Sequence, residues 1–137
     1  MMAAGEFRGG CGIQRRVRFD SEGWLKIVAE RGTVPPYGLF GGGEAAPSQV
    51  VLTGADGDAK QLPSKTAPLN VKAGDELFLK CAAGDGFGDL RDRPVGNPQD
   101  DVDNAYVSPE ITREVYGAEV VSVADRPNGV RFVQRNN

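Results

Sequence analysis

Cys81-Ala-Ala-Gly-Asp-Gly-Phe-Gly-Asp-Leu-Arg-Asp-Arg, residues 81–93, separates two kinds of local pattern in this chain. Upstream of this glycine loop, apolar and polar residues alternate, which is typical of strands. Downstream, an Asn-Pro pair at 97–98 and a Ser-Pro pair at 108–109 each place a capping side chain before a proline, as in the first turn of a helix. This order predicts a mainly β (α+β) fold with two short helices near the C-terminus.

The segments upstream of the glycine loop are predicted to form antiparallel hairpins. Residues 13–19 and 24–31 alternate on either side of an Asp-Ser-Glu-Gly turn. Residues 50–53 and 60–62 flank a second turn, Ala-Asp-Gly-Asp. Another strand is expected over residues 76–81. We expect these short antiparallel strands to form one twisted sheet or sandwich.

The last part of the chain is expected to return from the helices to strands. The second helix carries Ile111 and Val115 one turn apart and ends at Gly117. Strands are then predicted over residues 118–123 and 130–133, joined by an Asn-Gly turn.

Length and composition bound the class of protein. The 137 residues are expected to form a single domain, 1–137, with residues 1–10 as an extended arm. A net charge of −3 gives no electrostatic reason to bind nucleic acid. No apolar run is long enough to span a membrane, and the first residues lack a signal peptide's apolar core, so we expect a cytoplasmic protein without a membrane partner. Cys11 and Cys81 are expected to be buried free thiols in a reducing compartment.

The glycine loop contains a candidate ligand site. Gly84, Gly86 and Gly88 give a G-x-G-x-G spacing, and Arg91 and Arg93 follow closely enough to reach a bound carboxylate or phosphate. A phosphate cradle formed by this chain alone is disfavoured, because the next residues cannot open a helix whose amides would point at the anion. The alternatives are a tight turn in which glycine lets two elements cross closely, and structural ion pairs for both arginines.

Large side chains in the irregular stretch 33–47 form a candidate partner interface. Left uncovered, they would make an adhesive apolar patch, so we expect them to dock on another protein together with the arm. The candidate interface residues are Phe7, Pro35, Pro36, Tyr37, Leu39 and Phe40.

The chain has few residues suited to catalysis. It contains no histidine, so it cannot form a Ser-His or Cys-His pair, and a zinc site is not expected. Asp100, Asp101 and Asp103 stand where carboxylates stabilise a helix dipole, and the adjacent pair would point to different sides. We therefore expect no catalytic residue and no metal ligand in this chain.

The order of these motifs resembles the C-terminal part of the hydantoinase B family, which includes subunits of ATP-dependent hydantoinases, 5-oxoprolinases, and acetone and acetophenone carboxylases. The pieces that carry the resemblance are Gly5-Glu-Phe-Arg-Gly-Gly-Cys-Gly12, Glu30-Arg31, Pro35-Pro-Tyr-Gly-Leu-Phe-Gly-Gly42, Gly74-Asp75, Gly86-Phe-Gly-Asp89, Tyr106-Val-Ser-Pro-Glu110 and Tyr116-Gly117. The family's subunits are several times longer than this chain. The resemblance therefore implies that a separate large subunit carries the catalytic residues.

The resemblance implies a small non-catalytic subunit of a multi-subunit ATP-dependent ketone carboxylase, a ligase, most like the small subunit of an acetophenone-carboxylase-type complex. The implied partners are larger hydantoinase A-like and B-like subunits in a hetero-oligomer. Those partners are expected to bind ATP and a divalent metal, and this chain alone is expected to bind no cofactor. The alternatives are a subunit of an ATP-dependent hydantoinase or oxoprolinase-type amide hydrolase, a free-standing β module that binds a small ligand at residues 84–93, and a truncated remnant of a hydantoinase B gene.

Overall fold

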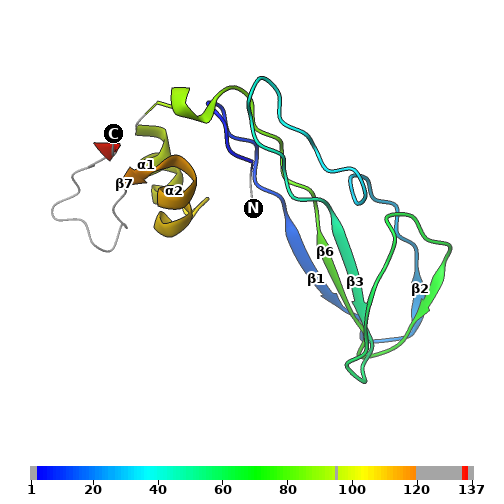
Figure 1. Ribbon diagram of the computed structural model, residues 1–137. Coiled ribbons are helices and arrows are strands. Elements are labelled where there is room, and N and C mark those ends of the chain that lie inside the picture. The colour runs from blue at the N-terminus through cyan, green and yellow to red at the C-terminus, as the bar shows by residue number, and fades with distance from the viewer. Residues whose placement is uncertain (1–2, 95, 120–133, 136–137) are drawn as a thin grey trace.

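The computed structural model describes residues 3–94, 96–119 and 134–135 (Figure 1). The fold is mainly β with two short helices towards the C-terminal end, as the sequence predicted. The strands are β1 (Gln14–Arg18), β2 (Gly23–Leu25), β3 (Gln49–Thr53), β4 (Ala59–Gln61), β5 (Leu69–Val71), β6 (Glu76–Lys80), β7 (Ala118–Glu119) and β8 (Gln134–Arg135). The helices are the 3₁₀ turn η1 (Leu90–Asp92), α1 (Gly96–Asp103) and α2 (Pro109–Tyr116).

The main sheet is antiparallel, in the order β1-β6-β3-β4. β6 lies between β1 and β3, with Leu77 opposite both Val17 and Leu52. Because side chains alternate across a strand, Leu77 and Leu79 share the inner face. The buried core on that face consists of Ile27, Val50, Leu62 and Leu77.

The predicted hairpin between residues 13–19 and 24–31 is wrong. β1 pairs with β6, and β2 pairs with β5 in a separate two-stranded sheet. The chain leaves β1 beside the turn that precedes β6, where Phe19 N donates to Asp75 O and Gly74 N donates to Phe19 O. These bonds satisfy the backbone at the end of β1 and direct the next segment towards β5, a strand that the sequence pattern did not predict.

The alternation predicted for residues 24–31 is confirmed although the strand is shorter. β2 ends at Leu25, and beyond it Val28 makes only an isolated bridge to Lys65. Leu25 and Ile27 contact the core, whereas Trp24 and Val28 are exposed.

The hairpin of β3 and β4 forms as predicted. Its turn is closed by a bond from Gly54 N to Asp58 O, and Asp56 Oδ1 accepts a bond from Asp58 N. Gly57 has a φ of 88°, which explains why glycine occupies this position.

The second helix begins and ends where the sequence indicated. Ser108 caps α2 by accepting a hydrogen bond from Ile111 N, and Gly117 ends it with a φ of 59°. α1 differs from the prediction, because it begins at Gly96 and Asn97 lies inside it rather than at its cap. The strand predicted over 118–123 is described only as β7, and the turn and strand predicted for residues 128–133 lie outside the described residues.

The expected burial of both cysteines is wrong, because Cys11 and Cys81 are exposed. Cys81 does continue the inner row of β6. The core covers only the part of this row that carries Leu77 and Leu79, and Ile13, opposite Cys81, is 71% exposed as well.

The described chain has two lobes (Figure 1). Strands β1–β6 form an elongated β lobe, and α1, α2 and β7 form a helical lobe at its far end. α1 and α2 contact each other, and Val102 packs with Val107 and Tyr116 between them. Neither of these described helices is long and apolar enough to cross a bilayer.

Candidate functional site

Three segments that are far apart in the sequence meet where the two lobes join. They are residues 3–10, 38–43 and 84–88, which we call the glycine crossing. Phe87 lies at its centre, since its N–H donates to Phe7 O and its carbonyl accepts from Phe7 N, both at 2.9 Å. On the other side, Leu39 N donates to Gly86 O at 3.1 Å and Gly88 N donates to Leu39 O at 3.0 Å.

Glycine is required here because the backbones lie too close together to leave room for a Cβ atom. A Cβ atom on Gly86 would overlap Ala4 O, and one on Gly42 would overlap Gly86 O. A Cβ on Gly84 would stand 2.8 Å from Gly10 N, and Gly88 has a φ of 76°. The three glycines of the predicted ligand site therefore lie in the close crossing that was the alternative explanation for them.

The N-terminal arm is part of this crossing. Ala3 is buried against Ala45 and Ala83. Gly43 N donates to Ala4 O at 2.7 Å, and Gly9 N donates to Ala3 O at 3.1 Å. The described arm residues are thus fixed to the irregular stretch and to the glycine loop.

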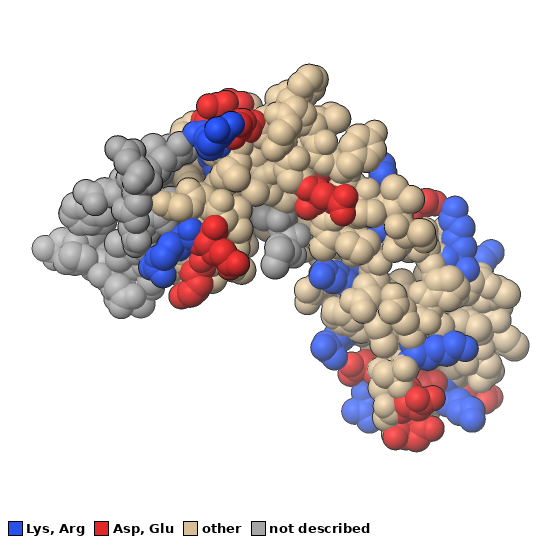
Figure 2. All heavy atoms as spheres, viewed as in Figure 1, with Lys and Arg blue, Asp and Glu red and all other residues tan. Residues whose placement is uncertain are grey.

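Four apolar side chains project from the crossing, and we call them the aromatic platform: Phe7, Leu39, Phe40 and Phe87. The ring of Phe87 lies 6.2 Å from that of Phe7 and 5.1 Å from that of Phe40, between centroids. Phe40 is 79% exposed, Phe7 60%, Leu39 46% and Phe87 45%. Figure 2 shows charged side chains along the β lobe, most densely at its far end, and around the helical lobe, while the outer surface of the bend between them is largely uncharged.

The platform contains three of the six predicted interface residues. Of the other three, Tyr37 is exposed, and Pro35 and Pro36 are half-buried earlier in the same stretch. Phe87 was missed, because the sequence reading treated it only as a spacer between glycines. The signal was present in the Gly-Phe-Gly triplet, where the two small residues leave the ring nothing local to pack on.

The two predicted ligand-binding arginines both bind acids of this chain. Arg91 pairs with Asp89 on the surface, and hydrogen bonds from the Arg91 side chain and backbone lower the pKa of Asp89 to about 2. Asp89 also caps η1. Arg93 is buried, donating from Nη2 to Asp101 Oδ2 at 2.6 Å and from Nη1 to Glu6 O at 3.1 Å. This geometry corresponds to the structural ion pairs considered from the sequence.

Asp101 is the centre of a buried charge cluster that sequence reasoning did not identify. Its other oxygen, Oδ1, accepts a 2.6 Å bond from Arg8 Nε. The Arg8 guanidinium lies 4.7 Å from the centre of the Tyr106 ring, and that of Arg93 lies 5.2 Å from the Tyr116 ring. We call Arg8, Arg93 and Asp101 the guanidinium clasp. The guanidinium clasp joins the arm, the end of the β lobe and both helices. Burial raises the pKa of Tyr116, whose ring lies beside Arg93.

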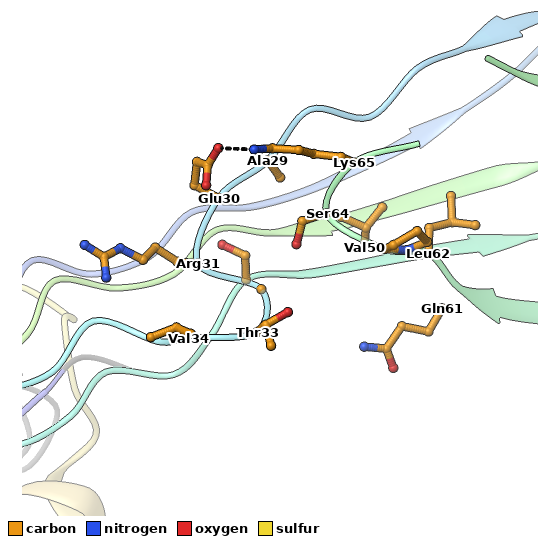
Figure 3. Close-up of a pocket in the computed structure, with 13 residues that line it drawn as sticks. Ala29, Glu30, Arg31, Thr33, Val34, Val50, Gln61, Leu62, Ser64 and Lys65 are labelled. Carbon is orange, nitrogen blue, oxygen red and sulfur yellow. Dashed lines mark ion pairs between the residues drawn. The ribbon is translucent and has the colours of Figure 1, made fainter. Parts of the chain in front are cut away.

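Two further kinds of site are relevant to the described residues, a metal centre and an open groove. No group of three or more acidic or cysteine side chains in them could hold a metal ion. An open groove of about 830 Å³ lies between residues 29–34 and 61–65 (Figure 3). The interaction marked within it is an exposed ion pair, Lys65 Nζ to Glu30 Oε1 at 2.9 Å, and the labelled side chains diverge rather than converge on one point.

The family model of hydantoinase B/oxoprolinase matches residues 1–90, which include the whole glycine crossing. The chain belongs to the hydantoinase B/oxoprolinase family. The matched range ends before α1, so the helical lobe lies outside it.

Relatives of this hydantoinase B/oxoprolinase family chain are much longer than it is. An uncharacterised protein of Methanocaldococcus jannaschii is 27% identical over 123 residues, which cover 89% of this chain and 21% of that protein. A 5-oxoprolinase of Dictyostelium discoideum is 29% identical over 84 residues, covering 61% of this chain and 7% of the relative. The chain therefore spans about a fifth or less of the length of these relatives.

A solved structure has the same fold. A nucleotide-free acetone carboxylase, described in work on ATP-dependent acetone carboxylation, matches with a TM-score of 0.65 and 23% identity. The match covers 90% of this chain and 21% of the acetone carboxylase chain. The likeness shows that the fold of this chain occurs as one part of a larger polypeptide.

Proposed function

We propose that this chain is a small, non-catalytic subunit of a multi-subunit ATP-dependent ketone carboxylase, and that it completes the fold of a larger hydantoinase B-like subunit. Such a ligase, of the acetone or acetophenone carboxylase type, activates a ketone by phosphorylation with ATP and carboxylates it with bicarbonate. In this proposal ATP and the divalent metal bind to the larger hydantoinase A-like and B-like subunits.

One observation carries the proposal: the chain corresponds to 21% of an acetone carboxylase chain of the same fold. Among the described residues no group of three or more acidic or cysteine side chains could hold a metal ion, which supports assigning the catalytic residues to the larger subunits in this proposal. Family membership and the exposed aromatic platform support the same conclusion, because large exposed apolar groups are typical of surfaces that are covered in an assembly.

Reconstitution tests the proposal. The chain would be co-expressed with any hydantoinase A-like and B-like chains encoded beside it. ATP- and bicarbonate-dependent consumption of acetone or acetophenone would be measured with and without it. We expect the complex to lose most of its activity when this chain is omitted. Full activity without the chain, or the absence of any complex, would refute the proposal.

A second candidate is an ATP-dependent amide hydrolase of the oxoprolinase type, favoured by the similarity to the Dictyostelium 5-oxoprolinase. The same complex, assayed with 5-oxoproline or hydantoin, separates the two. Hydrolysis that needs ATP but not bicarbonate would favour the amide hydrolase, whereas bicarbonate-dependent ketone consumption favours the carboxylase.

A further inference from the structure

We infer that the aromatic platform is a preformed docking face for the hydantoinase B-like body, with Phe87 at its centre and Phe40 as its most projecting anchor. This inference rests on the proposed function, since it presumes that such a body exists. Beyond the proposed function, the inference specifies where the two proteins meet and which side chains provide the affinity.

Hydrogen bonds within this chain hold the platform in place. Both backbone polar groups of Phe87 are bonded to Phe7, and Leu39 is bonded to the residues on either side of Phe87. The backbones are in close contact here, because a Cβ added at Gly42 or Gly86 would collide with backbone atoms. A face held in this way loses little conformational freedom on binding, so most of the contact energy remains as affinity.

The rings form one continuous apolar surface. The Phe87 ring contacts the rings of Phe7 and Phe40 at distances typical of tilted aromatic pairs. Phe40 holds a φ of 51°, a conformation that non-glycine residues seldom adopt, and it is largely exposed despite its contact with Phe87. A strained backbone that holds a large apolar ring in an exposed position is consistent with a partner that covers the ring.

The surroundings fit a protein partner. Two of the nearby charges, Asp89 and Arg91, are paired with each other, so an approaching apolar surface need not neutralise them. The Glu6 carboxylate also lies at this rim, beside Gly88. An apolar centre with a paired polar rim is the usual anatomy of a protein–protein interface, and exposed aromatic anchors usually dominate its energy.

The length of the relatives identifies the occupant. All four platform residues lie within residues 1–90, the part that matches the family. In the Methanocaldococcus relative and in acetone carboxylase, the corresponding segment is 21% of one chain, so most of each chain lies outside it. We expect a β module within such a chain to contact the remainder through grouped exposed apolar side chains, and the platform provides four of them.

Binding measurements on variants test the inference. Phe40→Asn removes the ring and keeps the backbone, because Asn tolerates a positive φ. Phe7→Ser removes a second ring at the edge of the platform. The matched control is Trp24→Ser, which removes a ring that is 75% exposed on β2, at the other end of the β lobe from the crossing. Dissociation constants for the hydantoinase B-like chain would be measured by calorimetry, and circular dichroism would verify that each variant is folded.

We expect Phe40→Asn to weaken binding by about 30-fold or more, the scale of an interface hot spot, and Trp24→Ser to weaken it less than about 3-fold. Wild-type affinity in a folded Phe7→Ser/Phe40→Asn double variant would overturn the inference and leave the proposed function intact. Failure of the unmodified chain to bind would overturn both. Sedimentation of the chain alone tests whether a second copy of the chain covers the platform instead. If the chain self-associates, and Phe40→Asn abolishes this self-association but leaves the hetero-complex unchanged, the inference would also be overturned.

Discussion

Arg93 and Asp101 form a buried ion pair, 2.6 Å between Nη2 and Oδ2, at the point where the β lobe meets the helices. Arg93 is 4% exposed and Asp101 is 5% exposed. Asp101 also accepts from Arg8, 93 positions away in the chain. One carboxylate of α1 is thus the common acceptor for the N-terminal arm and for the segment after η1.

Asp101→Asn is expected to destabilise the protein by about 3 kcal/mol, because it leaves two largely buried guanidinium groups without their counter-charge. Chemical denaturation followed by circular dichroism would measure the change. Arg91→Ala is the control, since it breaks an ion pair that is fully solvated and should change stability little. Equal effects of the two substitutions would show that the guanidinium clasp does not join the lobes.

Gly9→Ala is expected to cost about 2 kcal/mol or more, because the added Cβ would overlap Gly84 O and force two backbones apart. Gly10→Ala is the matched control, since a Cβ at Gly10 would meet nothing within 4 Å, and its effect should stay within about 0.5 kcal/mol. Thermal unfolding of the two variants provides the comparison. A Gly9→Ala protein as stable as Gly10→Ala would contradict the close approach of the arm and the glycine loop.

Asp89 is expected to titrate far below an ordinary aspartate. Its pKa falls from 3.8 to about 2, chiefly through the hydrogen bond from the Arg91 side chain. Because the folded-state pKa is depressed, the contribution of this pair is fully present above pH 4 and is lost as the pH falls through about 2. Carboxyl NMR titration would measure the value.

In Arg91→Ala the pKa of Asp89 should rise towards 3.8 without reaching it, because the backbone N–H of residue 91 still donates to Oδ1. Asp92→Asn serves as the comparison variant, since Asp92 is not among the causes of the Asp89 shift. An unchanged Asp89 pKa in Arg91→Ala would show that the surface pair does not form in solution.

Both thiols are expected to react in the native state. Cys11 and Cys81 are exposed, and they are the chain's two cysteines, so Ellman's reagent should modify two groups per molecule without denaturant. Cys81→Ser would assign the two reactions. If either thiol reacted only after the protein unfolded, that cysteine would be buried, as the sequence predicted.

The features that the sequence predicted correctly depend on neighbouring residues. The alternation around Leu77 requires only a strand with one covered face, and the cap at Ser108 requires only the next helical turn. The turn at Gly57 likewise follows from local backbone preference.

The features that the sequence did not predict depend on distant partners. β1 pairs with β6 instead of β2, and nothing in residues 13–31 encodes that preference. The burial of Asp101 depends on Arg8, and the platform depends on Phe7 and Phe87 meeting. The expectation that consecutive strands pair is a tendency, and here the bonds of Phe19 to the turn before β6 override it.

The bridge between Phe7 and Phe87 also constrains when the aromatic platform can form. It closes a loop of 80 positions, and the entropy of closing a loop must be repaid by the contacts made at its ends. On the ribosome, residues 5–9 emerge early but have no partner strand until residues 84–88 have left the exit tunnel. A chain interrupted before this point would present its phenylalanines separately. Under the docking inference above, a partner would therefore bind only molecules whose synthesis had passed the crossing.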